Sequence, residues 1–205
     1  MTRDVVLAPG LWMPGMAMAL LAARLARAGY VPHVFAYRGR SPLEGNVARF
    51  ARFAREALAG RPGHFIGHSL GGVLVLEALN AHEELRVASA ILLAAPVRGC
   101  LAGRRLASAR VGRWMMGACG ELWQERDALW RRKAPLGIIA GTLPVGLGRA
   151  LGRLPGPSDG VVRVEETAVD GMTARALVPL GHSLLIVSGA VGRLVERFIS
   201  AGRFE

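Results

Sequence analysis

The sequence contains few cysteines and few aromatic residues. Its two cysteines, Cys100 and Cys119, are not spaced as a C-x-x-C pair, so no metal site is predicted from them. Two free thiols that pack as small hydrophobic groups are the expected state. A disulfide between the two cysteines stays open as the alternative.

Lysine is almost absent. Lys133 is the only one, and arginine therefore supplies nearly all of the net charge of +11. A basic surface can bind the phosphate backbone of a nucleic acid. However, the chain has neither zinc-finger spacing nor a basic zipper, and only 6% of its residues are aromatic. We therefore expect no nucleic-acid partner, while a weak contact with an anionic membrane surface stays open.

The chain also lacks a hydrophobic run long enough to span a bilayer, which takes about 20 residues. The apolar stretch 16–28 is shorter and is interrupted by Arg24 and Arg27. The first residues lead into an apolar segment without the pattern of a signal peptide, so we expect a cytoplasmic protein. With 205 residues, 52% of them hydrophobic, the chain is expected to form a single domain, 1–205, with a substantial core.

Short apolar runs alternate with amphipathic segments along most of the chain. The runs typical of buried strands are 5–8, 31–37, 64–67, 87–95, 136–140 and 174–180. Helices are predicted at 15–28, 41–59, 70–81, 121–132 and 183–200, and 142–157 is expected to be mostly loop. Because crossovers of this length join parallel strands, the sequence predicts an α/β fold with a six-stranded parallel sheet covered by helices on both faces.

The third of these runs is followed by Gly67-His68-Ser69-Leu70-Gly71-Gly72. Strand, tight turn and helix form the context of a G-x-S-x-G nucleophile elbow, in which the turn exposes the serine hydroxyl. The glycines allow close approach of the chain segments, and the Leu70 N–H at the helix start can face a developing oxyanion. A plain turn explains the pentapeptide equally well, so the assignment depends on finding a base and an acid.

His182 is the histidine best placed to act as the base. It follows the last predicted strand by one glycine and precedes the last helix. That is the carboxyl edge of a parallel sheet, where Ser69 also lies. The other histidines lie in strands, beside the serine or near a helix end: His33, His64, His68 and His82.

The acid is expected in a loop at the same edge, between Ser69 and His182 in the chain. The candidates are Asp127, Asp159, Glu165, Glu166 and Asp170. We prefer Asp159, which lies in a turn after the fifth predicted strand; its alternative role is that of a helix N-cap. A second oxyanion donor should come from the loop after the first strand, where the Leu11 N–H follows Gly10, with the Trp12 N–H as the alternative.

These motifs resemble those of the α/β-hydrolase superfamily, in its compact bacterial lipase/esterase-like branch. The shared features are the order Ser, Asp, His, the elbow, the Ser-Asp-Gly-Val-Val loop at 158–162 and the Gly-His-Ser stretch at 181–183; here Pro-Gly-Leu-Trp replaces the usual His-Gly of the oxyanion loop. The resemblance implies that Ser69 is the nucleophile, Asp159 the orienting acid and His182 the base. It also implies an oxyanion hole made by the N–H groups of Leu11 and Leu70.

The segment 97–134 breaks the alternation, and it follows the fourth strand, where this superfamily often has a cap or lid. It contains nine Arg or Lys residues against three acids. The arginines are expected on a solvated helix face, with attraction of an anionic lipid surface or of an acidic leaving group to this basic cap as the alternative. It also contains Trp114, Trp123 and Trp130, and the only other tryptophan is Trp12. These four are candidates for lining a substrate pocket, with packing inside the cap as a compatible alternative.

The sequence therefore predicts a serine hydrolase of the esterase or lipase type, acting on a small-molecule carboxylic ester through an acyl-enzyme and needing no metal or cofactor. A thioesterase or acyltransferase with the same three residues is the first alternative. A non-catalytic binding protein on a hydrolase scaffold is the second. Acyl-chain length, the alcohol part and the oligomeric state are not determined by the sequence.

Overall fold

The fold is centred on a six-stranded parallel sheet, seen in a computed structural model that describes residues 2–13, 15–145 and 152–205. The spatial order is β2-β1-β3-β4-β5-β6, and every neighbouring pair is parallel. The strands are β1 (Asp4–Ala8), β2 (Val31–Val34), β3 (Gly63–His68), β4 (Val87–Leu93), β5 (Leu136–Gly141) and β6 (Ala174–Val178). The predicted α/β fold and six-stranded parallel sheet are confirmed.

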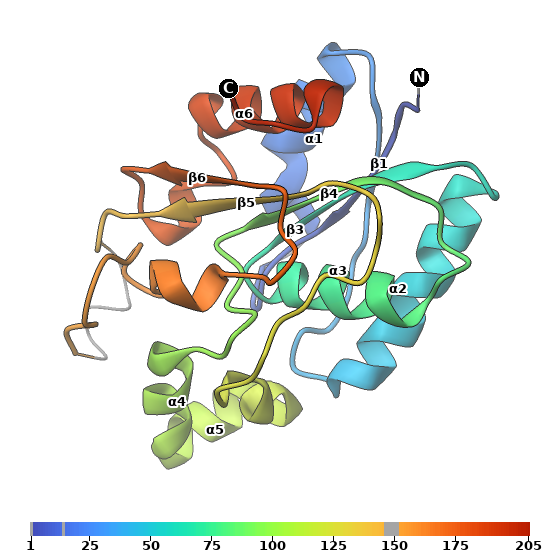
Figure 1. Ribbon diagram of the computed structural model, residues 1–205. Helices are drawn as coiled ribbons and strands as arrows, with labels where there is room; N and C mark the ends of the chain where they lie inside the picture. The colour runs from blue at the N-terminus through green and yellow to red at the C-terminus, as the bar shows by residue number, and fades with distance from the viewer. Residues whose placement is uncertain (1, 14, 146–151) are drawn as a thin grey trace.

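Helices cover both faces of the sheet (Figure 1). Two helices, α1 (Ala19–Arg27) and α6 (Gly189–Ala201), lie on one face, and α2 (Leu43–Leu58) and α3 (Leu70–Ala81) lie on the other. Short 3-10 helices are η1 (Gly15–Met18), η4 (Val164–Thr167) and η5 (His182–Leu184). In the described part of the chain, no helix has both the length and the apolar character needed to cross a membrane.

The alternation of side chains along β1 shows how the two faces are filled. Val5 and Leu7 belong to the hydrophobic cluster under α1 and α6, whereas Val6 and Ala8 belong to the cluster under α2 and α3. This follows from the two-residue period of a strand. Because both faces are covered, every position of β1 is buried, and its residues 5–8 form a continuous apolar run after Asp4.

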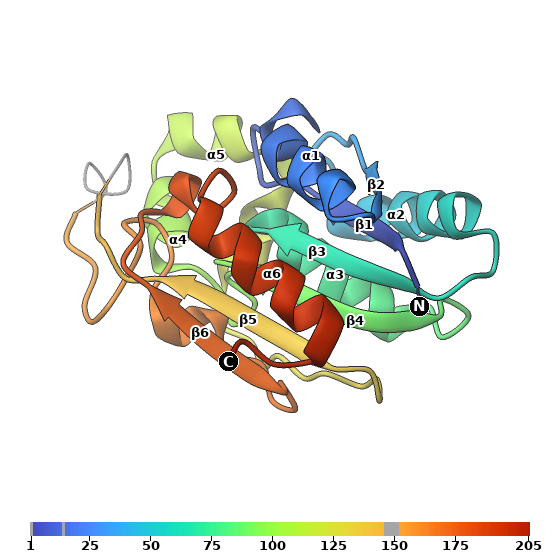
Figure 2. The ribbon, with the colours of Figure 1, turned by 90° about the horizontal axis from the view of Figure 1, so that it is seen from above.

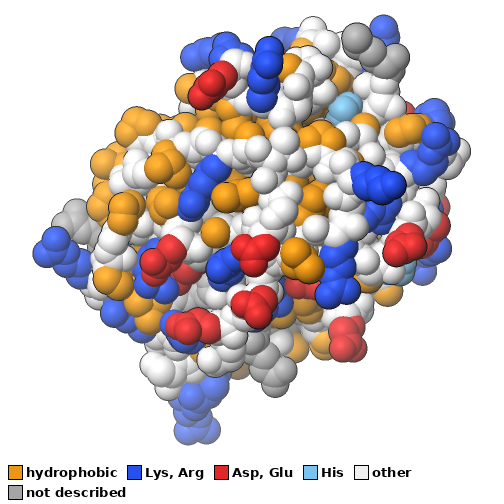
Figure 3. Space-filling view, in the orientation of Figure 1, with side chains coloured by type: hydrophobic (Ala, Val, Ile, Leu, Met, Phe, Trp, Pro, Cys, Tyr) orange, Lys and Arg blue, Asp and Glu red, His pale blue; other side chains and the backbone are white. Residues whose placement is uncertain are grey.

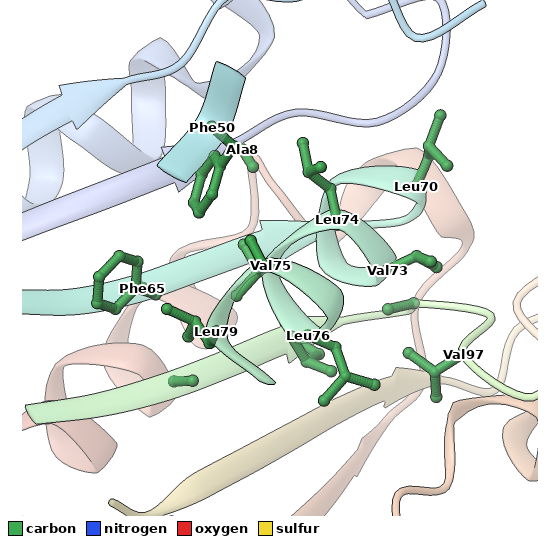
Figure 4. Packing of buried hydrophobic residues seen from close by; sticks show 14 of the residues in the cluster. Ala8, Phe50, Phe65, Leu70, Val73, Leu74, Val75, Leu76, Leu79 and Val97 are labelled. Carbon is green, nitrogen blue, oxygen red and sulfur yellow. The ribbon is translucent and has the colours of Figure 1, made fainter. Parts of the chain in front are cut away.

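The helix α3 is apolar on nearly all sides because it packs at the centre of its layer. Its buried residues include Val73, Leu74, Val75, Leu76 and Leu79, which Figure 4 shows pointing to several sides of the helix, near Phe50 of α2 and Phe65 of β3. Full burial of such a side chain contributes about 1.5–3 kcal/mol. The same helix begins at the elbow, so this packing fixes the position of Ser69.

The segment after β4 folds into α4 (Leu101–Ser108), α5 (Arg110–Met116) and the 3-10 helix η2 (Gly117–Trp123). Figure 2 shows α4 and α5 beside the carboxyl ends of the strands. The predicted helix at 121–132 is wrong, because η2 ends at Trp123 and no helix follows before β5. Backbone groups here pair with other segments instead: the N–H of Arg126 donates to Arg98 and that of Trp130 to Asp170.

Other element boundaries also differ from the prediction. The last helix is split, because η5 ends at Leu184 and α6 begins only after Ser188, whose hydroxyl accepts from the Val191 N–H. The expected loop at 142–157 contains no helix or strand in 142–145 and 152–157. Residues 146–151 of that loop lie outside the described residues.

Candidate active site

Ser69 occupies the turn between β3 and α3 with backbone angles of φ 54° and ψ −125°. A non-glycine residue at positive φ is strained, and such strain persists only where the surrounding structure imposes it. The close contacts that impose this backbone conformation lie at two neighbouring glycines. A Cβ built on Gly67 would lie 2.4 Å from the carbonyl oxygen of Gly71, and one built on Gly71 would lie 2.2 Å from that of Ala8. Neither position has room for a side chain.

Asp159 and His182 form a direct pair at the carboxyl ends of β5 and β6. The Asp159 Oδ2 atom lies 2.7 Å from the Nδ1 atom of His182, and the His182 backbone N–H donates to the Asp159 carbonyl at 3.0 Å. Asp159 is 1% exposed, and its Oδ1 atom accepts from the backbone N–H groups of Val161 and Val162 at 2.9 and 2.7 Å. The alternative role as a helix N-cap is not realised, because the next helix, η4, begins only at Val164; these bonds stabilise a turn instead.

The geometry of this pair assigns the two ring nitrogens of His182. Nδ1–H donates to the carboxylate, which leaves the Nε2 lone pair available to accept a proton. Ser69 and His182 line the same cavity, and no hydrogen bond joins their side chains within the described residues. Such bonds are commonly long in unliganded sites and shorten when substrate is bound.

His68 lies behind His182, fully buried. Its Nε2–H donates to the backbone carbonyl of His182 at 3.1 Å, and the two rings are 4.8 Å apart. Its Nδ1 atom has no partner among the described residues. Burial, followed by the charge on His182, lowers the pKa of His68 to about 3, so the ring is neutral. Sequence analysis gave His68 no role; its place at the buried end of a central strand was the available signal.

The loop after β1 lies directly against the elbow. A Cβ built on Gly10 would lie 3.0 Å from the Cβ of Ser69. Within the described part of the chain, the backbone N–H groups of Leu11 and Leu70 donate to no acceptor. The Leu70 N–H is at the first turn of α3, where helix geometry leaves it unpaired and the helix dipole favours negative charge.

A cavity of about 550 Å³ opens at Ser69 and His182. Its wall is mostly apolar, and no Asp, Glu, Lys or Arg lines it among the described residues. The segment 97–134 supplies much of this wall through Leu106, Met115, Met116 and Trp123. A wall of this kind suits an uncharged apolar group, since an unpaired charge would lose its hydration without compensation.

The four tryptophans proposed for the pocket fall into two groups. Trp12 and Trp123 line the cavity. Trp12 also ties the oxyanion loop to α5, because its Nε1–H donates to the Met115 carbonyl at 3.1 Å. Trp114 and Trp130 are not in the cavity wall: Trp114 is 71% exposed, and Trp130 is buried elsewhere with its Nε1–H on the Ala134 carbonyl.

The remaining acid candidates are engaged elsewhere or exposed. Glu166 is buried and accepts from the Leu101 N–H at 2.7 Å, which ties the start of α4 to η4. Asp170 pairs with Arg98, Glu165 pairs with Arg163, and Asp127 is exposed. Asp159 is thus the one acid of the five that contacts His182 in the described part of the chain.

Neither cysteine is part of a reactive group in this structure. Cys100 and Cys119 are both buried and free, so the disulfide alternative is not realised. Burial raises the pKa of Cys100 to about 12 and that of Cys119 to about 11, which keeps both thiols protonated and unreactive. Among the described residues, no cluster of three His, Cys, Asp or Glu side chains could hold a metal ion.

A sequence model of the alpha/beta hydrolase family matches residues 5–183. The chain belongs to this family. The matched range includes Ser69, Asp159 and His182. A search of curated protein sequences found no match.

Solved structures with the same fold include several hydrolases. Phospholipase PlaB from Legionella pneumophila is 18% identical with a TM-score of 0.64, over 82% of this chain and 46% of that one, so this chain spans less than half of the phospholipase. Pyrethroid hydrolase PytH is 15% identical with a TM-score of 0.69, over 98% of this chain and 99% of that one. A metagenomic carboxyl esterase is 18% identical with a TM-score of 0.61, over 97% of this chain and 76% of that one. At these identities the likeness concerns the fold.

Proposed function

We propose that this protein is a serine hydrolase that cleaves carboxylic esters through an acyl-enzyme. The observation that carries the proposal is the 2.7 Å contact between Asp159 and His182, in a cavity that also exposes Ser69 on a strained turn. The esterase and phospholipase names among the structural neighbours agree with this chemistry.

In the proposed mechanism, Ser69 Oγ attacks the acyl carbonyl while His182 Nε2 takes the hydroxyl proton. Asp159 stabilises the imidazolium that forms and holds the ring in the required tautomer. The N–H groups of Leu11 and Leu70 receive the oxyanion, and one such donor contributes about 3–4 kcal/mol in the transition state. The proton then passes from His182 to the leaving oxygen. Water activated by His182 hydrolyses the acyl-enzyme.

We also propose that the segment 97–134 acts as the cap of a single domain. Its helices α4 and α5 contribute to the apolar wall beside Ser69, where they would enclose the acyl group. The contacts that hold this cap to the rest of the chain include the Trp12 bond to Met115 and the Glu166 bond to Leu101. In this arrangement the acyl chain lies between the cap and the sheet.

The nucleophile is tested with Ser69→Ala and a p-nitrophenyl acyl ester. We expect kcat to fall by several orders of magnitude, on the order of 10⁶-fold in a comparable serine enzyme. Ser200→Ala, an equal change on the exposed side of α6, should leave turnover unchanged. Mass spectrometry after treatment with a fluorophosphonate should place the adduct on the Ser69 peptide. Retention of wild-type turnover by Ser69→Ala would contradict the proposal, and absence of an adduct would favour a non-catalytic binding protein.

A further inference from the structure

A second cavity, of about 620 Å³, borders the same oxyanion loop. The two cavities share the wall residues Gly10, Leu11, Trp12 and Met13. The other wall of the second cavity is the loop after β2, residues 37–41, together with Gly117. We refer to this second cavity as the arginine groove, because Arg38 and Arg40 line it.

The loop after β2 is held closely against the proposed oxyanion hole. Tyr37 donates its hydroxyl hydrogen to the Pro9 carbonyl at 2.9 Å. A Cβ built on Gly39 would lie 2.9 Å from Leu11 Cδ1 and 3.4 Å from Leu70 Cδ2. The residues that carry the two oxyanion donors are therefore in contact with the loop that carries Arg38 and Arg40. A carbonyl bound by these donors would have the apolar cavity and the arginine groove as its two neighbouring spaces.

The arginine groove differs from the apolar cavity in charge. Its lining contains two arginines and no acid among the described residues. Arg38 is exposed, and its side chain makes no hydrogen bond or ion pair in the described part of the chain. Arg40 donates to the Trp114 carbonyl and lies 5.2 Å from the centre of the Trp114 ring. Seven other arginines are paired with carboxylates: Arg24, Arg55, Arg61, Arg98, Arg104, Arg126 and Arg163. Further arginines, such as Arg52 on α2, make no ion pair within the described residues but do not line this groove.

The absence of an acid in its lining distinguishes the groove from the face of the protein drawn in Figure 3. On the face drawn in Figure 3, Lys and Arg side chains are interspersed with Asp and Glu and do not form one continuous band. In the groove, by contrast, the described lining holds no acid beside the two arginines. Two cations without a carboxylate, in a concave wall, attract an anion more strongly than the same charges on an open surface.

We propose that the arginine groove is the subsite for the leaving group, and that this group carries a phosphate. The inference rests on the proposed function, because Ser69 places the scissile bond between the two cavities. In the reaction, the bond from Ser69 Oγ to the acyl carbon forms, the bond to the leaving oxygen or sulfur breaks, and that atom receives the serine proton through His182. The phosphate takes no part in bond making. A phospholipid headgroup and a nucleotide-bearing thiol such as coenzyme A present the same chemistry.

The first experiment compares two esters that differ only in leaving-group charge: p-nitrophenyl octanoate and the same ester with a sulfonate on the phenyl ring. Arg38→Gln should raise KM for the sulfonated ester by about two- to fivefold, the value of one exposed ion pair. Arg38→Glu, which replaces attraction with repulsion, should raise it by about tenfold. Both changes should affect kcat/KM less for the neutral ester than for the sulfonated ester. The control is Arg52→Gln, which removes the same charge from the exposed side of α2.

The second experiment measures binding without turnover. Calorimetry measures the Kd of the intact sulfonated ester for two proteins: the Ser69→Ala variant, and the same variant that also carries Arg38→Glu. We expect Arg38→Glu to raise Kd by the same factor as KM. If Ser69→Ala hydrolyses the neutral ester normally, the proposed function fails, and the KM comparison between Arg38 and its variants still decides on the groove. The groove proposal is overturned if Kd is unchanged by charge reversal, or if Arg52→Gln weakens binding as much as Arg38→Gln.

Two further substrates distinguish the sources of the phosphate. An effect of Arg38→Glu on octanoyl-CoA alone supports a nucleotide-borne phosphate. An effect on monomeric dioctanoyl phosphatidylglycerol alone supports a lipid headgroup. If both substrates respond, the groove recognises the phosphate itself. If neither responds, a phosphate-bearing leaving group is ruled out.

Discussion

The neutral state of His68 should make the folded protein sensitive to mild acid. Its pKa is about 3 in the folded chain, against about 6.5 for an exposed histidine. Between these values the unfolded chain binds a proton that the folded chain does not, so stability decreases as pH falls. Integrating the difference in bound protons for this one group gives a loss of about 2 kcal/mol in the free energy of unfolding between pH 7 and pH 5.

The matching variant is His68→Gln. A glutamine amide can donate to the His182 carbonyl from the position of the imidazole Nε2–H, and it does not titrate. The free energy of unfolding in urea is measured for both proteins at pH 7, 6 and 5. Other groups with shifted pKa values, such as Asp4 and His64, are present in both proteins and cancel in the difference. We expect the stability advantage of the wild type to shrink by about 2 kcal/mol between pH 7 and pH 5.

This experiment separates burial of a neutral ring from a role in catalysis. If the two stability curves run parallel from pH 7 to pH 5, His68 is not held neutral, and the reasoning from its burial is refuted. If they converge as expected, the hydrogen bond to His182 is made by a neutral donor. The imidazolium formed on His182 during proton transfer then has an uncharged neighbour at a ring distance of 4.8 Å, and no repulsion opposes it from that side.

Two predictions concern the active site itself. Asp159→Asn should lower kcat by about 10⁴-fold, because the amide presents the wrong hydrogen-bonding group to His182. The fold should be kept, because a side-chain oxygen still accepts from the N–H groups of Val161 and Val162. A variant that circular dichroism shows to be unfolded, or one with near-normal kcat, would contradict this. For p-nitrophenyl esters of increasing chain length, each added methylene should raise kcat/KM by up to about fourfold until the apolar cavity is full. Leu106→Trp should then move the optimum to shorter chains, and an unchanged optimum would place the acyl chain elsewhere.

The sheet was predictable because its signal is local and strong. A central parallel strand is buried on both faces, so it appears as an apolar run whatever its partners are. The length of an edge strand is harder to predict, because it depends on how far the single neighbouring strand continues to pair with it. We expected a strand at 31–37, but β2 ends at Val34, opposite Leu7 of β1, and the Phe35 N–H makes the last rung to the Leu7 carbonyl.

The helix at 121–132 shows where periodicity misleads. The seven-residue repeat of Leu122-Trp123 and Leu129-Trp130 also arises when two pairs of side chains anchor an irregular segment at separate places. The Trp123 side chain packs against Gly103 of α4, whereas the backbone N–H of Trp130 donates to the Asp170 carbonyl. Hydrogen bonds to distant parts of the chain replaced those within a helix, and a local pattern contains no information about them.

The proximity of Ser69, Asp159 and His182 could be anticipated because the fold itself produces it. Parallel strands end at a common edge, so residues that follow β3, β5 and β6 meet there whatever lies between them. Substrate recognition has no such rule. His68, Leu106 and Met115 line the apolar cavity through tertiary contacts that have no motif, and the prediction from tryptophan content alone placed Trp114 in a wall that it does not form.

The loop at 10–13, which carries the proposed oxyanion donor Leu11, lies between the two cavities. One side of Gly10–Met13 faces the apolar cavity and the other faces the arginine groove, while Trp12 bonds the loop to α5. A movement of α5 would therefore displace the loop that carries the Leu11 N–H. Since Arg40 also bonds to Trp114 of α5, the cap contacts both the donor loop and the groove. The helix α5 is thus joined by direct contacts to the loop at 10–13 through Trp12 and to the loop after β2 through Arg40.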